Sequence, residues 1–254
     1  MRDLVRESAN ESIENEIAIL HQLDQTICNK IDRESRDTGE SKMVCAWNTL
    51  TTLLPEYRAF KEMGIRPTSA RGLMAEIMLK YILESWAKKR GISYVYYGNL
   101  LLPRPDGGTT QLDGVFITPT FAAVVECKSY YGKLTIENGK IKGRTGVATP
   151  WKQNYGHIIS LKKVLGDKAR IYFHNVVYIF SEGIITDYEP TPEEYLMVNR
   201  VALSTLDHLN KNQNFRNELS QADLNEVANE LEQYIPSVAE EEEHIQFVNS
   251  LIQV

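Results

Sequence analysis

Two apolar runs separated by a turn do most to limit what this chain can fold into. The runs are Val115 to Ile117 and Phe121 to Val125, and Thr118-Pro119-Thr120 lies between them. Extended runs on either side of a short break with proline predict a β-hairpin. Because side chains alternate between the two faces of a strand, Glu126 and Lys128 at the end of the second run point the same way. Burying such a charged pair is costly, which favours a functional role.

Asp113 lies just before the first run, on the strand that pairs with the one ending in Glu126 and Lys128. Carboxylates are hard oxygen ligands for Mg²⁺, and a neighbouring lysine is a point charge for a phosphate or an attacking water. The three residues therefore predict metal-assisted phosphodiester hydrolysis. Glu and Lys two residues apart are also common on a solvated strand face, so the pattern alone leaves this second interpretation open.

The order of these residues resembles the catalytic motif of the PD-(D/E)xK nuclease superfamily, with Asp113, Glu126 and Lys128 in the places of D…ExK. It resembles more closely the nuclease-related domain (NERD) family, over roughly residues 70–205. One departure is that Gln-Leu precedes Asp113, so the Pro105-Asp106 pair is not the catalytic one.

Features around the motif carry the closer resemblance. They are an upstream helix with a glycine and a glutamate, a glycine after the motif, a short hairpin, and a helix with a glutamine. The Asn138-Gly139 pair is a strong local signal for the hairpin turn. In this chain the features are Gly72 and Glu76, Gly132, residues 133–142 and Gln153.

The resemblance implies an α/β fold with a restriction-endonuclease-like core, in which helices flank a mixed central sheet. It also implies one or two Mg²⁺ or Mn²⁺ ions, held by Asp113, Glu126, the backbone carbonyl of Cys127 and, through water, Glu76. Lys128 would then orient the attacking water, help to deprotonate it, or stabilise the transition state.

Two residues of this set have ordinary interpretations beside the catalytic one. Glu76 begins a row of charged residues at helical spacing, which is typical of a surface ion-pair ladder. Gln153 could bind the scissile phosphate or orient the lysine, as the resemblance implies, or be an exposed helix residue. His157 follows one turn later and is interpreted as a surface or packing residue, because no second histidine lies at metal-ligand spacing.

The distribution of charge supports a nucleic-acid partner although the net charge is −6. Residues 86–173 carry 14 basic and 5 acidic side chains, whereas residues 174–254 carry 3 and 15. A local basic field suits a phosphate backbone, although the same residues could simply solvate the surface. We expect DNA as the partner, contacted by Lys133, Lys140, Lys142, Arg144 and Lys152.

Three segments are predicted. Residues 1–66 are a helical N-terminal extension with a helical hairpin, residues 67–203 the nuclease-like core, and residues 204–254 a helical, acidic C-terminal region. The terminal helices could cover the core, clamp DNA or form a homodimer surface.

Composition places the chain among ordinary globular proteins, with 43% apolar and 24% charged residues. No apolar run has the length of a membrane span, so we expect no membrane contact, and residues 1–20 lack the apolar centre of a signal peptide. The three cysteines have no CxxC spacing, which favours a reducing compartment and a cytoplasmic location.

The sequence thus predicts a Mg²⁺- or Mn²⁺-dependent deoxyribonuclease, with internal or terminal attack left open. Two alternatives remain. One is a sequence-specific restriction endonuclease on the same core, and the other is a non-catalytic module that binds DNA or protein.

Overall fold

A computed structural model gives the fold. It describes residues 2–105, 107–130, 132–143, 146–168, 170–180, 185–188, 194–198, 202–211 and 218–252. The chain divides into two compact units, one of residues 1–78 with 236–254 and one of residues 79–235. The predicted boundaries after residues 66 and 203 stay a prediction.

The first unit is helical. Gly39 follows the first helix with a φ of 73°, which glycine adopts without steric cost. Ser41 then caps the next helix by accepting a hydrogen bond from the backbone N–H of Val44. The two predicted N-terminal helices are therefore present. The unit contains α1 (Arg2–Thr38), α2 (Lys42–Leu53), α3 (Tyr57–Glu62), the beginning of α4 (Pro67–Arg90) and α8 (Val238–Ile252).

Polar contacts join the helices of this unit. The hydroxyl of Thr49 on α2 donates to Glu34 on α1 at 3.0 Å. His21 on α1 contacts Glu241 on α8 at 3.0 Å, across 220 residues of sequence. The C-terminal helix thus packs with the N-terminal ones.

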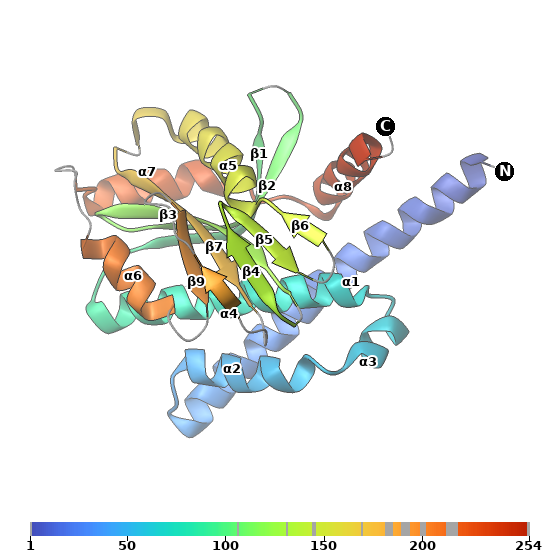
Figure 1. The fold of residues 1–254 in the computed structure, drawn as a ribbon, viewed down its shortest axis with the longest axis horizontal. Coiled ribbons are helices and arrows are strands. Elements are labelled where there is room, and N and C mark those ends of the chain that lie inside the picture. The colour runs from blue at the N-terminus through green and yellow to red at the C-terminus, as the bar shows by residue number, and fades with distance from the viewer. Residues whose placement is uncertain are drawn as a thin grey trace. The chain divides into compact units, whose positions relative to one another are not determined.

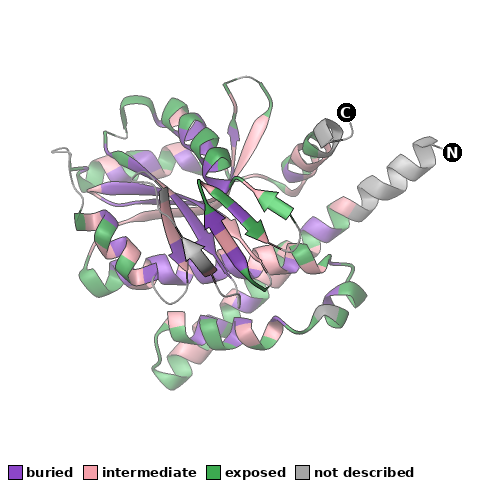
Figure 2. Cartoon of the chain, in the orientation of Figure 1, coloured by how far each residue is buried: buried purple, intermediate pink, exposed green. Residues whose placement is uncertain are grey.

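The second unit is built on a mixed sheet of five strands in the order β1-β2-β3-β7-β9. β1, β2 and β3 are antiparallel neighbours, whereas β3, β7 and β9 run parallel. The helix-flanked mixed sheet that the sequence predicted is confirmed, and Figure 2 shows that its middle strands are mostly buried. In Figure 1 the strands are β1 (Val95–Pro103), β2 (Thr109–Ile117), β3 (Phe121–Lys128), β7 (Tyr172–Ile179) and β9 (Glu194–Val198).

A smaller sheet of four strands has the order β6-β5-β4-β8. The predicted hairpin forms its centre, and Asn138 and Gly139 both have positive φ, at 49° and 68°, as a tight hairpin turn requires. The strands are β4 (Leu134–Glu137), β5 (Lys140–Gly143), β6 (Gly146–Ala148) and β8 (Ile185–Tyr188).

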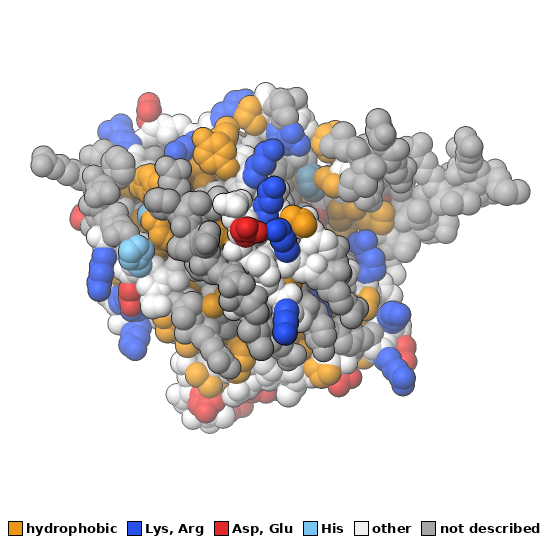
Figure 3. Space-filling model, in the orientation of Figure 1, with side chains coloured by type: hydrophobic (Ala, Val, Ile, Leu, Met, Phe, Trp, Pro, Cys, Tyr) orange, Lys and Arg blue, Asp and Glu red, His pale blue; other side chains and the backbone are white. Residues whose placement is uncertain are grey.

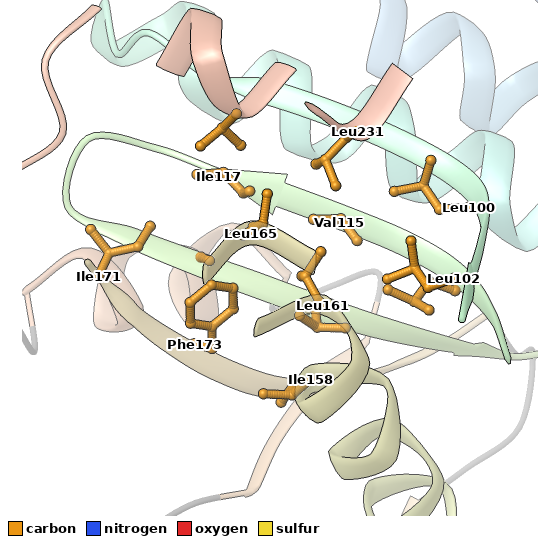
Figure 4. Packing of buried hydrophobic residues seen from close by; sticks show 14 of the residues in the cluster. Leu100, Leu102, Val115, Ile117, Ile158, Leu161, Leu165, Ile171, Phe173 and Leu231 are labelled. Carbon is orange, nitrogen blue, oxygen red and sulfur yellow. The ribbon is translucent and has the colours of Figure 1, made fainter. Parts of the chain in front are cut away.

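Helices α5 (Pro150–Leu165) and α7 (Gln221–Glu232) contribute to the apolar core on one face of the larger sheet. In Figure 4, Leu161 and Leu165 of α5 lie beside Val115 of β2, and Phe173 of β7 is close by. Full burial of one such side chain contributes roughly 1.5–3 kcal/mol. Asp113 lies two residues before Val115 on β2, so its side chain projects from this same face.

The opposite face packs on residues 79–90 of α4. Trp86 meets the rings of Phe116 and Phe121 edge-on, with centroids 6.1 and 5.9 Å away. A Cβ at Gly114 would lie only 2.9 Å from Cδ2 of Leu79, so glycine permits the close approach of helix and strand. The remaining helices are α6 (Ala202–Lys211) and the short η1 (Gly166–Lys168). None of the helices in the described ranges is long and apolar enough to cross a membrane.

Candidate active site

The hairpin of β2 and β3 brings Asp113 and Glu126 to one face. The turn closes where the backbone N–H of Thr118 donates to the carbonyl of Phe121 at 2.9 Å. The strands pair with Gly114 opposite Val125, so the next residues outward, Asp113 and Glu126, stand opposite each other. Opposite residues of an antiparallel pair project from the same face.

Lys128 completes the group. Its Nζ donates to Oε1 of Glu126, and Oδ2 of Asp113 accepts a hydrogen bond of 2.8 Å from the backbone N–H of Cys127. The Glu126 side chain is 1% exposed and that of Lys128 is 26% exposed. Asp113, Glu126 and Lys128 therefore converge, as the sequence predicted, and Lys128 keeps a route to solvent.

Burial has the largest effect on the pKa values of the two carboxyl groups. It raises the pKa of Asp113, although the charge of Lys128 and the N–H of Cys127 act in the opposite direction. Burial and then the charge of Asp113 raise the pKa of Glu126 to about 7, against the opposing charge of Lys128. Two carboxylates this close do not readily ionise together unless a cation joins them.

The ammonium of Lys128 is held charged. Burial alone would lower the pKa of Lys128, but the charge and hydrogen bond of Glu126, with the charge of Asp113, raise it. Tyr130, just after the motif, shares this field: burial raises the pKa of its phenol, and Lys128 opposes that rise. Tyr130 is thus a neighbour of the site that the sequence did not single out.

His157 of α5 approaches Glu126 from the helix side. Its Nδ1 lies 3.4 Å from Oε2 of Glu126, and the two side chains are 5% and 1% exposed. This Oε2 is buried and accepts no hydrogen bond from the residues that the structure describes. The contact leaves it poorly satisfied, as expected of an oxygen that serves another ligand.

Asn154 holds α5 in this position. Its Nδ2 donates to the carbonyls of Val124 at 2.7 Å and Val176 at 3.1 Å, and to Oδ1 of Asn175 at 2.8 Å. The amide of Asn175 in turn donates to the carbonyl of Trp151 at 2.8 Å. This network ties the helix to β3 and β7, and it places His157 one turn further along.

Two further residues were predicted to belong to the site. Gln153 is exposed at the start of α5, and its side chain makes no contact with Asp113, Glu126 or Lys128 in the described part of the chain. Glu76 is half-buried on α4 in the first unit. Its role as a metal ligand stays a prediction.

The group fits a hard divalent cation with a small protein donor set. Within the described ranges, no cluster of three or more His, Cys, Asp or Glu side chains could hold a metal. The donors are thus two carboxylates, from Asp113 and Glu126, with the carbonyl of Cys127 as the predicted third. Mg²⁺ commonly binds one or two carboxylates and completes its shell with water and substrate phosphate. The poorly satisfied Oε2 of Glu126 agrees with such a ligand.

The predicted nucleic-acid contacts lie on or next to the smaller sheet and α5. Lys133, Lys140 and Lys142 are exposed before and on the hairpin, and Lys152 is exposed on α5. Lys142 pairs with Glu137 at 2.7 Å, which neutralises part of its charge. Arg144 lies outside the described residues. Figure 3 shows Lys and Arg side chains in the middle of the face where Figure 1 draws β4 and β5.

His157 and Asn154 were missed as site residues, although the sequence contained a signal for both. Each lies four residues before an inward apolar residue of α5, Leu161 and Ile158 respectively. Polar residues on the buried stripe of a helix require partners. That rule, applied to α5, would have marked both.

Comparison with known proteins identifies a related family. Residues 71–180 match the model of the family described as nuclease-related domain, and the match contains Asp113, Glu126 and Lys128. No curated protein and no solved structure matches the chain. This match over residues 71–180 confirms the resemblance to the nuclease-related domain family that was stated from the sequence.

Proposed function

We propose that this protein hydrolyses phosphodiester bonds of nucleic acid, with DNA as the substrate, in a reaction that depends on Mg²⁺ or Mn²⁺. The observation that carries the proposal is the buried convergence of Asp113, Glu126 and Lys128 at one end of β3. A structural ion pair needs no second carboxylate at such cost in desolvation.

Asp113 and Glu126, with the carbonyl of Cys127, would hold the cation. Such an ion, when bound, lowers the pKa of an attacking water and screens the phosphate charge. Desolvation and mutual repulsion raise the pKa values of the two carboxyl groups, and a bound divalent cation would offset both effects, which favours its binding.

Lys128 acts as a fixed positive charge. Because its pKa is raised, it is protonated at neutral pH and is a poor base in the metal-free protein. Of the three roles considered for it, stabilising charge on the phosphoryl oxygens fits best. The 26% exposure of its side chain gives a substrate phosphate access to it.

The hydrolysis proposal is tested with linear, circular and single-stranded DNA, with and without Mg²⁺ or Mn²⁺. We expect metal-dependent cleavage by the wild type and a loss of at least about a hundredfold in Asp113→Asn and Lys128→Ala. Lys88→Ala is the matched control, because this exposed lysine also pairs with a glutamate but is not a predicted nucleic-acid contact. Equal cleavage by wild type, Asp113→Asn and Lys128→Ala would refute the proposal.

A non-catalytic nucleic-acid-binding module is the second candidate. The exposed lysines Lys133, Lys140 and Lys152 favour it, because they could bind a phosphate backbone without cleaving it. The same experiment separates the two functions. Binding of these substrates without cleavage under any metal condition would establish the module.

A further inference from the structure

A basic groove lies in the helical unit, on helices that the proposed nuclease site does not use. It has a volume of about 780 Å³ and lies between the C-terminal half of α1 and the start of α2. Lys30, Arg33 and Arg36 of α1 and Lys42 of α2 line it, and we call it the α1–α2 groove. Asp32 is the one acidic side chain among its described lining residues.

The basic residues of this helical segment gather on the side that faces the groove. Residues 26–42 contain four basic and four acidic residues, so the segment is neutral as a whole. The lining positions on α1 include residues 26, 29, 30, 33 and 36, a spacing that keeps them on one side of the helix. The concave surface is therefore far more positive than the segment that forms it.

The arginines are the available cations of the groove. Asp32 pairs with Lys42 at 2.8 Å, and Lys30 lies 3.7 Å from Glu34. Arg33 and Arg36 are exposed, and neither has an ion pair with any residue that the structure describes. A guanidinium presents a planar fork of donors that matches a phosphate, so two adjacent arginines suit a phosphate-bearing ligand.

The spacing indicates a chain of phosphates. Lys30 and Arg36 are six residues apart, which is about 9 Å along a helix axis and more than one phosphate group spans. The polar side chains of Thr26 and Asn29 line the same groove and add hydrogen-bonding capacity. We propose that the α1–α2 groove binds the sugar-phosphate backbone of a nucleic acid, as a second binding site separate from the predicted catalytic residues.

The test measures binding of a labelled DNA oligonucleotide by the full chain, in EDTA so that cleavage does not interfere. The test variant is Arg33→Gln/Arg36→Gln. Its matched control is Arg58→Gln/Lys61→Gln, which removes two exposed cations of α3 in the same unit that do not line the groove. Thermal unfolding of both variants checks that the fold is kept.

We expect the test variant to lose affinity by about tenfold or more, and its plot of log affinity against log salt to become shallower by about 2. The control should bind like wild type, and inorganic phosphate should compete only at much higher phosphate concentration than unlabelled DNA. The proposal would be overturned if the wild type did not bind, or if the test variant bound as tightly as the wild type. It would also be overturned if the control lost as much affinity as the test variant, or if phosphate competed as well as unlabelled DNA. If the wild type cleaves no DNA but the test variant still loses affinity, the result supports the groove and refutes only the proposed nuclease activity.

Discussion

Replacing Glu126 by glutamine should stabilise the metal-free protein at neutral and alkaline pH. The wild-type side chain is 1% exposed, and burial together with the charge of Asp113 raises its pKa from 4.5 to about 7. Glutamine keeps the shape and an oxygen that can accept from Lys128, but it has no proton to lose. The substitution therefore removes the cost of burying a negative charge.

The raised pKa sets the size of this effect. Below about pH 4.5 the carboxyl group is protonated in both the folded and the unfolded chain. As pH rises toward 7, the unfolded chain releases its proton while the folded chain keeps it, so the wild type loses stability. A pKa raised from 4.5 to about 7 corresponds to about 3 kcal/mol, fully lost above pH 7. The opposing charge of Lys128 is already included in that value.

Urea unfolding in EDTA at about pH 4.5, 6 and 8 measures the difference between variant and wild type. Glu137→Gln is the matched control: Glu137 is exposed, and its hydrogen bond and charge pairing with Lys142 lower its pKa, so its effect has the opposite sign. A free energy of unfolding for Glu126→Gln that is no higher than wild type at pH 8, or a difference that does not grow with pH, would refute the reasoning.

Three further predictions concern the second unit. Gly114→Ala should destabilise the fold by about 1–3 kcal/mol, because the new methyl group would clash with the buried Leu79. Gly156→Ala, on an open face of α5, should stabilise the fold by about 0.5–1 kcal/mol. Equal midpoints of urea unfolding for the two variants would contradict this. Asn154→Ala should cost about 1–3 kcal/mol in urea unfolding because it removes the hydrogen bonds that tie α5 to the sheet, and wild-type stability would argue against them. Burial and then the charge of a neighbouring histidine lower the pKa of His174 to about 4, so its contribution is present above pH 6.5 and about 3 kcal/mol is lost as pH falls through 4. Acid titration of stability should show a smaller loss in His174→Phe, and an unchanged acid limb would count against that assignment.

What the sequence predicted well depends on neighbours in the chain. The hairpin of β2 and β3 follows from two apolar runs and a proline-containing break, and the turn of β4 and β5 follows from Asn138-Gly139. The convergence of Asp113, Glu126 and Lys128 follows from the same hairpin, because alternation and register decide which side chains share a face.

The sequence did not predict contacts between residues that are far apart in the chain. β8 pairs with β4 in parallel although β5, β6, α5 and β7 lie between them in the chain, and no local pattern encodes that partner. The pairing of His21 with Glu241 joins helices at opposite ends of the chain. His157 was interpreted from its spacing alone, whereas its contact with Glu126 depends on how Asn154 seats α5 on the sheet.

The hydrogen bond from the backbone of Cys127 to Asp113 has a consequence for the middle letter of the Glu-x-Lys motif. Because the main chain makes this contact, it does not depend on the thiol of Cys127. Proline alone lacks the N–H that the contact needs. Substitution of Cys127 by proline should therefore remove this hydrogen bond, whereas other substitutions should keep its donor.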